Sequence, residues 1–320
     1  MCGIAGFFPV RQSADSGALE VVCQIMGQMR RRGPDAEGVS TSDCVTLGHR
    51  RLAVIDPNAR ANQPMVTPDG RYNIVFSGEI YNFQTLQDDL MSTGRHFSTT
   101  SDTEVILALF AAEGAAMLPK LRGMFAFVIW DSLTRRGFAA LDPYGIKPLY
   151  VATVAGGVLL ASQVKALLAT GLVSREPDPR GQAGFWLLGS VPEPHTWYRS
   201  IKAIPAGHSA WIEGGRIAEP ICWSDIGSAW REAPAALLPD DAVRGKVRAA
   251  LRESVARHLV ADVPIGVFLS GSGEAPAERH YRPPEDRIRD FGWALVGDGI
   301  SCKHDETGQP GMGEALARAL

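Results

Sequence analysis

MCGIAGFF, at positions 1–8, opens the chain with a short apolar run that contains two glycines. A run of this kind suits a buried strand, and its glycines allow another backbone to approach closely. Similar runs follow at 45–56 (VTLGHRRLAVID), 72–82 (YNIVFSGEIYN) and 123–131 (GMFAFVIWD). The last run is apolar at nearly every position, which is typical of a strand that is covered on both faces.

Helical segments interrupt these strands. Apolar residues recur at spacings of three and four in 17–30 (GALEVVCQIMGQMR), 83–94 (FQTLQDDLMSTG) and 101–114 (SDTEVILALFAAEG). More strand-like runs follow, at 135–142, 148–154 and 157–162. Strands and helices do not alternate regularly, so the pattern predicts an α+β domain with two antiparallel sheets between helices.

Composition excludes several classes of protein. The formal net charge of -3 argues against binding to nucleic acid or to a membrane surface. No apolar stretch approaches the ~20 residues that span a bilayer, and the first residues lack the pattern of a signal peptide, so we expect a cytoplasmic protein. The 5 cysteines form no CxxC pair, which predicts neither a zinc site nor disulfides; we expect Cys23, Cys44 and Cys222 to be buried.

Cys2 follows the initiator methionine directly. Once Met1 is removed, the thiol lies beside its own α-amine, whose ordinary pKa is about 7.7–8.0. Much of that amine is neutral near pH 7, so it can act as general base for the thiol without a histidine. A cysteine at position two is commonly incidental, so this reading needs support from the rest of the sequence.

Several blocks supply that support: MCGIAGFF, RRRGPD (30–35), HRRLAVID (49–56), SGEIYNF (77–83), TSDTEVIL (100–107), LDPYGIKPLY (141–150) and VPIGVFLSG (263–271). Together they resemble the class II glutamine amidotransferases, and most closely the glutamine-hydrolysing asparagine synthetases. The resemblance implies an N-terminal-nucleophile αββα fold. It also implies that a Cys2 thioester releases ammonia from glutamine for the ATP-dependent amidation of aspartate. For the glutaminase it implies no cofactor and no metal, for an intact relative ATP and Mg, and possibly a homodimer.

The same resemblance gives roles to individual residues. Arg51 matches the arginine that binds the glutamine carboxylate, although a surface arginine is the alternative. Asp102 matches the aspartate that binds the ammonium, and it could also cap a helix. The remaining assignments are Glu79 as a second acidic ligand, Val54 and Ile55 through their backbone, and Arg32 as a fixed cation near the nucleophile.

The oxyanion hole departs from the family pattern. Relatives have Asn-Gly where this chain has Ser77 and Gly78. Gly78 keeps a backbone N–H, whereas Ser77 offers a shorter hydroxyl donor. Loss of one oxyanion donor typically slows a reaction about 100- to 1000-fold, so we expect a slower glutaminase than a typical relative.

We expect a glutaminase domain at 1–218, a linker at 219–240, the start of an ATP-pyrophosphatase domain at 241–271 and a tail at 272–320. The helix predicted at 241–260 would leave a Val/Leu stripe uncovered. Ser270 and Gly271 match the start of the family's phosphate loop, but the chain then continues SGEAPAE without its Asp-Ser pair. We interpret the tail as a truncation or a shifted reading frame, with a natural extension as the alternative. We expect the tail to be disordered and the chain to lack the synthetase activity.

The sequence leaves alternatives to this function. The chain could be a remnant without catalysis that binds a partner or regulates one. It could also belong with the glucosamine-phosphate synthases or the purine amidotransferases, but the VPIGVFLSG block argues against both.

Overall fold

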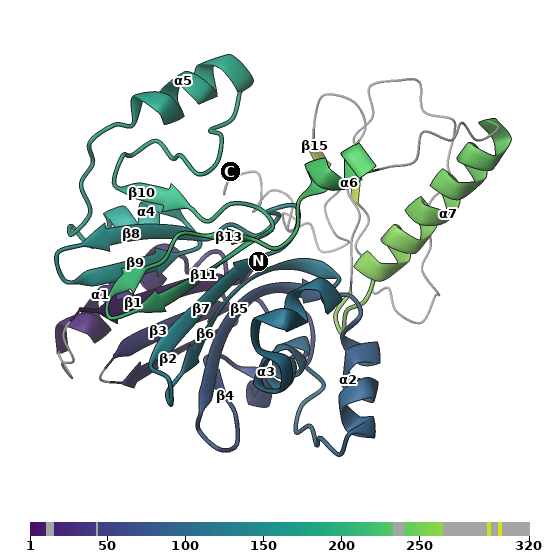
Figure 1. The fold of residues 1–320 in the computed structure, drawn as a ribbon, viewed down its shortest axis with the longest axis horizontal. Coiled ribbons are helices and arrows are strands. Elements are labelled where there is room, and N and C mark those ends of the chain that lie inside the picture. Colours follow the sequence, from purple (N-terminus) through teal and green to yellow (C-terminus); the bar gives the residue numbers. More distant parts are fainter. Residues whose placement is uncertain (11–15, 43, 233–239, 265–292, 296–299, 303–320) are drawn as a thin grey trace. The chain divides into compact units, whose positions relative to one another are not determined.

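The computed structural model describes residues 1–10, 16–42, 44–232, 240–264, 293–295 and 300–302 (Figure 1). The chain forms two compact units, Met1–Val260 and Ala261–Leu320. In the second unit, β14 (Trp293–Leu295) pairs antiparallel with β15 (Ile300–Cys302). Ser270, Gly271 and most of the predicted strand VPIGVFL lie outside the described residues, as does most of the predicted tail.

Two antiparallel sheets form the centre of the first unit. The first sheet has the order β10-β8-β9-β1-β3-β2. Its strands are β1 (Gly3–Pro9), β2 (Ala36–Ser42), β3 (Val45–Arg51), β8 (Tyr150–Val154), β9 (Gly157–Ala161) and β10 (Ile201–Ala203). The second sheet has the order β12-β11-β7-β6-β5-β4, and β13 pairs with β11. Its strands are β4 (Met65–Val66), β5 (Tyr72–Ile80), β6 (Gly123–Asp131), β7 (Arg136–Leu141), β11 (His208–Glu213), β12 (Arg216–Ile217) and β13 (Ile221–Cys222).

Helices cover the outer face of each sheet. On the first sheet these are α1 (Ser16–Gln28) and α4 (Val164–Leu168); on the second they are α2 (Phe83–Ser92) and α3 (Asp102–Glu113). Short 3-10 helices span Ala59–Ala61 and Gly114–Lys120. The later helices are α5 (Pro179–Leu188), α6 (Ile226–Glu232) and α7 (Asp240–His258).

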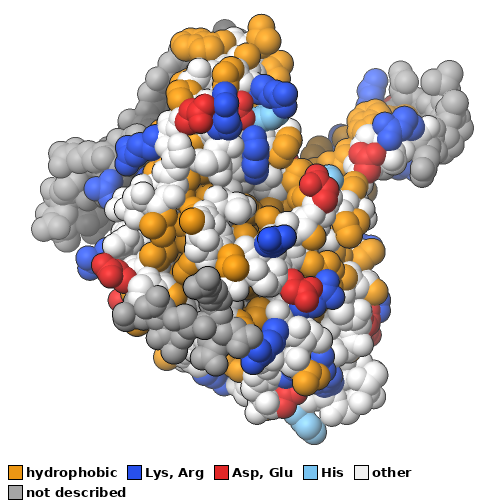
Figure 2. Space-filling model, turned by 60° about the vertical axis from the view of Figure 1, so that its left-hand side comes forward, with side chains coloured by type: hydrophobic (Ala, Val, Ile, Leu, Met, Phe, Trp, Pro, Cys, Tyr) orange, Lys and Arg blue, Asp and Glu red, His pale blue; other side chains and the backbone are white. Residues whose placement is uncertain are grey.

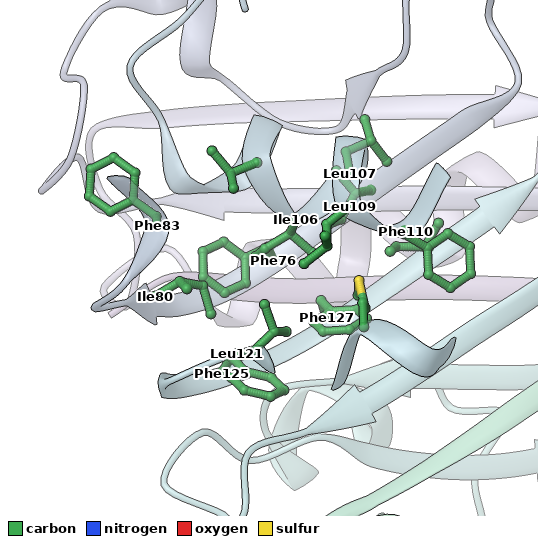
Figure 3. Packing of buried hydrophobic residues seen from close by; sticks show 14 of the residues in the cluster. Phe76, Ile80, Phe83, Ile106, Leu107, Leu109, Phe110, Leu121, Phe125 and Phe127 are labelled. Atoms are coloured by element: carbon green, nitrogen blue, oxygen red, sulfur yellow. The ribbon is translucent and has the colours of Figure 1, made fainter. Parts of the chain in front are cut away.

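Three clusters of buried side chains fill the spaces between these layers. One joins the two sheets through side chains such as Ile4, Phe8 and Val128. A second joins the second sheet to α2 and α3, with Phe76 and Phe127 facing Ile106 and Phe110 (Figure 3). The third joins the first sheet to α1 and α4. The predicted α+β sandwich of two antiparallel sheets between helices is therefore confirmed.

Some local predictions were wrong. Helix α5 and strand β2 were not predicted, and α6 lies within the segment read as a linker. Cys23 and Cys222 are exposed and Cys44 is half-buried. Cys23 lies on the outward face of α1, and Cys222 lies on the short strand β13.

Two apolar surfaces stand out as exposed among the described residues. On α7, Val243, Val247, Leu251 and Val255 are 41% to 61% exposed, as the sequence predicted. At the end of α5, Trp186, Leu187 and Leu188 are 68% to 82% exposed, and Figure 2 shows orange side chains there, at the top of the molecule. Within the described part of the chain, no helix has the length and apolar character needed to cross a membrane.

Candidate active site

A small pocket of about 180 Å³ opens where the ends of β1, β3 and β5 meet. It collects side chains from segments that are far apart in the sequence. Of the residues predicted for the site, it is lined by Cys2, Arg51, Val54, Ile55, Gly78, Glu79 and Asp102. Residues of four separate sequence blocks therefore meet at one place.

Cys2 is held firmly at the edge of this pocket. Its sulfur accepts a hydrogen bond from the Leu52 N–H at 3.4 Å. Its carbonyl oxygen accepts two more, from Arg32 Nε at 2.7 Å and from Ser77 Oγ at 3.0 Å. Burial raises the pKa of the Cys2 thiol, and the Leu52 N–H only partly offsets this effect. The thiol therefore needs a base to become a nucleophile.

The turn that carries Arg32 packs directly on β3. A Cβ atom on Gly33 would lie 2.3 Å from the carbonyl carbon and oxygen of Arg50, so no larger residue fits there. Asp35 closes the turn by accepting a hydrogen bond from the Ala53 N–H at 2.8 Å. The RRRGPD block thus holds Arg32 against the backbone carbonyl of Cys2.

Arg51 is buried and organises the segment beside the pocket. One terminal nitrogen donates to Asn58 O at 2.8 Å and to Asn62 Oδ1 at 2.7 Å. The other donates to the carbonyl oxygens of Ile55 and Asp56. All four terminal N–H groups of Arg51 are donated to oxygens of residues 55–62. The binding of the glutamine carboxylate by Arg51 therefore stays a prediction.

Two carboxyl groups share the pocket. Asp102 is the first residue of α3 and accepts a hydrogen bond from the Ile80 N–H at 3.1 Å; Ser101 is the helix cap. Burial raises the pKa of Asp102 to about 7, and the nearby charge of Glu79 adds a smaller increase. Burial also raises the pKa of Glu79. Two acids that resist ionisation in one cavity form a site that favours a cationic ligand.

Gly78 lines the pocket, but Ser77 does not. A Cβ on Gly78 would lie 2.2 Å from the Met124 carbonyl oxygen, so strand β6 approaches too closely for any side chain. The single hydroxyl proton of Ser77 is donated to the Cys2 carbonyl. In this geometry Gly78 remains a candidate oxyanion donor, while Ser77 supports the nucleophile.

Lys147 also lines the pocket, and it was not assigned a role from the sequence. It belongs to the quoted block LDPYGIKPLY, and it is 5% exposed. A lysine followed by proline between two apolar strands was the available signal. His49, by contrast, is fully buried and its Nε2 lies 2.9 Å from the Phe76 carbonyl oxygen, which suits a packing role.

Comparisons with known proteins fit this geometry. A family model described as "Glutamine amidotransferase domain" matches residues 1–223, and one described as "Asparagine synthase" matches residues 246–271. A putative asparagine synthetase [glutamine-hydrolyzing] of Mycobacterium tuberculosis is 38% identical, over 87% of this chain and 45% of that protein. Asparagine synthetase [glutamine-hydrolyzing] 1 of Bacillus subtilis is 37% identical, over 85% of this chain and 42% of that protein. The chain therefore spans less than half the length of these relatives.

A solved structure extends the likeness to the fold. Glutamine phosphoribosylpyrophosphate amidotransferase of B. subtilis, complexed with ADP and GMP, superposes with a TM-score of 0.52 at 19% identity, over 70% of this chain and 49% of that one. The layered sheets are those of an N-terminal-nucleophile amidotransferase, as predicted. With a family match over residues 1–223 and a cysteine at the edge of the pocket, this chain belongs to the glutamine amidotransferase domain family of enzymes.

Proposed function

We propose that this chain hydrolyses glutamine to glutamate and ammonia, with Cys2 as the nucleophile after removal of Met1. The observation that carries the proposal is the Cys2 thiol at the edge of a pocket that also holds the carboxylates of Glu79 and Asp102. These groups suit the two ends of glutamine, because the carboxylates bind its ammonium while the thiol faces its carboxamide.

The reaction follows from these positions. The α-amine of Cys2 takes the thiol proton, and the sulfur attacks the carboxamide carbon. The Gly78 N–H stabilises the oxyanion of the tetrahedral intermediate. The protonated amine then gives its proton to the leaving nitrogen, and ammonia departs. Water adds to the thioester with the amine again as base, and this releases glutamate and the free thiol.

The use of the ammonia is a second part of the proposal. The relatives' names and the match at 246–271 favour the amidation of aspartate to asparagine, which in an intact relative would need ATP and Mg. In this sequence Gly271 is followed by SGEAPAE. Without the Asp-Ser pair of the phosphate loop, we propose that this chain does not form the aspartyl adenylate by itself. The homodimer expected from the resemblance stays a prediction.

The test is glutamate release by the purified chain without ATP or aspartate. Mass spectrometry first establishes that the N-terminal residue is Cys2. Turnover of glutamine supports the proposal. A folded chain with a free N-terminal Cys2 that releases no glutamate would overturn it and would favour the remnant without catalysis.

Asp102→Asn should weaken glutamine binding and stabilise the protein at the same time. The substrate ammonium loses a charged partner, so we expect KM to rise about 30- to 100-fold, the usual effect of losing a hydrogen bond between charged groups. The pKa of Asp102 is about 7, so kcat/KM of the parent should decrease as the pH is lowered through that value. The variant has no carboxyl at this position, so its kcat/KM should not show this decrease. Steady-state kinetics between pH 5.5 and 8.5 measure both effects.

The stability effect has the opposite sign. The pKa of the Asp102 carboxyl is higher in the folded protein than in the unfolded chain, so its ionised form disfavours folding. The free energy of unfolding should therefore decrease as the pH rises from the pKa in the unfolded chain towards about 7. Above that pH the variant should be more stable by roughly 2–4 kcal/mol, since each pKa unit corresponds to about 1.4 kcal/mol. Urea unfolding at pH 8 measures this, and Asp88→Asn on the exposed face of α2 is the matched control. Lower stability than the control would contradict the assignment.

A further inference from the structure

The pocket offers two cations for the α-carboxylate of glutamine. Glutamine carries its carboxylate and its ammonium on the same carbon, so the group that binds the carboxylate must lie close to the acids that bind the ammonium. Within the described part of the chain, the lysine and arginine side chains that line the pocket with Glu79 and Asp102 are Arg51 and Lys147. Their hydrogen-bonding partners decide between them.

Arg51 has no terminal N–H group to spare. Each of its two terminal nitrogens donates to two oxygens of residues 55–62. A guanidinium carries two protons on each terminal nitrogen, so all four are used. Freeing one for the substrate would leave an oxygen of this segment without its donor, which costs free energy. Arg51 therefore adds charge to the pocket, while its terminal hydrogen bonds go to the protein.

The ammonium of Lys147, by contrast, has no protein partner. Lys147 is 5% exposed and lines the pocket with Cys2 and Glu79. Among the residues that the structure describes, none forms a hydrogen bond with its Nζ or an ion pair of 4.0 Å or less, Glu79 included. An ammonium has three N–H donors, and burying it without a partner is costly. A lysine enclosed in this way indicates an anionic ligand in the pocket.

The turn before β8 fixes the backbone of Lys147 at the pocket wall. The buried carboxylate of Asp142 accepts hydrogen bonds from the N–H groups of Tyr144 at 2.9 Å, Ile146 at 3.1 Å and Lys147 at 3.2 Å. It accepts a fourth from Phe125 on strand β6, at 3.1 Å. One aspartate thus anchors the whole turn to the second sheet, so the lysine is a built part of the pocket.

We propose that Lys147 binds the α-carboxylate of glutamine, in the role that the resemblance gives to Arg51. The inference rests on the proposed function and adds a substrate-binding residue to it. The substrate ammonium then faces Glu79 and Asp102, and its carboxylate faces the Lys147 ammonium. Arg51 has the separate task of holding residues 55–62 beside the pocket. Such a site selects a free α-amino acid over an amide in which the carboxylate is neutralised.

Calorimetry on the full chain carrying Cys2→Ala measures glutamine affinity without turnover. Adding Lys147→Met removes the ammonium and keeps a long, unbranched side chain. We expect Kd to rise about 10- to 100-fold, the usual effect of losing a hydrogen bond between charged groups. Lys147→Arg keeps a cation and should lose less affinity. Lys165→Met, which removes an exposed lysine of α4, is the matched control and should leave Kd unchanged.

Glutaminamide, in which a neutral amide replaces the α-carboxylate, shows which end of the substrate Lys147 contacts. In the chain that retains Cys2, the initial slope of ammonia release against substrate concentration gives kcat/KM even when binding is weak. Lys147→Met should lower kcat/KM for glutamine about 10- to 100-fold through KM and leave kcat/KM for glutaminamide unchanged. The parent should prefer glutamine over glutaminamide by a similar factor.

Other outcomes would overturn the inference. An unchanged Kd in the Lys147→Met variant would return the carboxylate to Arg51. An equal loss for both substrates would place Lys147 at the carboxamide end. The unfolding midpoint of Lys147→Met should equal or exceed that of its parent, because the lysine has no protein partner, and a lower midpoint would assign the lysine to structure. If the Cys2→Ala chain binds no glutamine and the parent hydrolyses none, the proposed function itself fails.

Discussion

A chain with one glycine inserted between Met1 and Cys2 should release glutamate at least about 1000-fold more slowly than the parent. The inserted chain keeps its thiol, but the α-amine moves to the glycine and no longer lies on the same residue as the sulfur. General-base catalysis is worth about 100- to 10,000-fold, and the buried thiol, with its raised pKa, depends on that base. Initial rates of glutamate formation at saturating glutamine measure the loss.

The control is Cys2→Ala, which removes the sulfur and keeps a free amine at its place. Both variants should retain the parent's unfolding midpoint, because the Cys2 carbonyl, which they preserve, carries the bonds from Arg32 and Ser77. If the inserted chain kept more than a tenth of the parent's rate, another base would be acting and the proposed mechanism would be wrong.

Ser77→Asn should raise kcat about 10- to 100-fold while KM changes little. The Ser77 hydroxyl proton is donated to the Cys2 carbonyl, so Gly78 is left as the oxyanion donor proposed here. An asparagine amide has two N–H donors and greater reach, and one oxyanion donor is typically worth about 100- to 1000-fold. The gain falls short of that range because Ser77 is 1% exposed and a larger side chain must displace its neighbours. Single-turnover rates of thioester formation report the effect.

Ser77→Ala is the companion variant. It removes the bond to the Cys2 carbonyl and adds no donor, so its rate should fall slightly below that of the parent. A folded Ser77→Asn protein with no gain in rate would contradict the oxyanion argument. Circular dichroism and the unfolding midpoint establish the folded state for both.

Much of the fold could be predicted because its signals are local and periodic. The spacing in α1, α2 and α3 and the unbroken apolar run of β6 predicted their type and layer. Helix α5 was missed although Asp178 caps it, Pro179 begins it and Gly189 ends it in a left-handed conformation. Its apolar residues are consecutive at 185–188 and point to solvent, so they carry no helical period.

The site was predictable in its members but not in its geometry. The resemblance to the class II glutamine amidotransferases assigned Cys2, Glu79 and Asp102 to the site, and the structure brings them to one pocket. Lys147 was missed because its relevance depends on a turn built by Asp142, and no spacing shows that a lysine will be buried. For Arg51, the sequence shows that a guanidinium is present. It does not show that oxygens of residues 55–62 accept hydrogen bonds from that group.

The contact between Tyr81 and His258 affects how this enzyme can be dissected. The two rings lie with centroids 4.5 Å apart, and they join the end of β5 to the last turn of α7, across the boundary between the two family matches. A fragment that ends at residue 223, where the first family match ends, would lack His258, whose imidazole acts on Glu79. Such a fragment is a different catalyst from the parent, so kinetic constants should be compared only between chains that share the same C-terminal boundary.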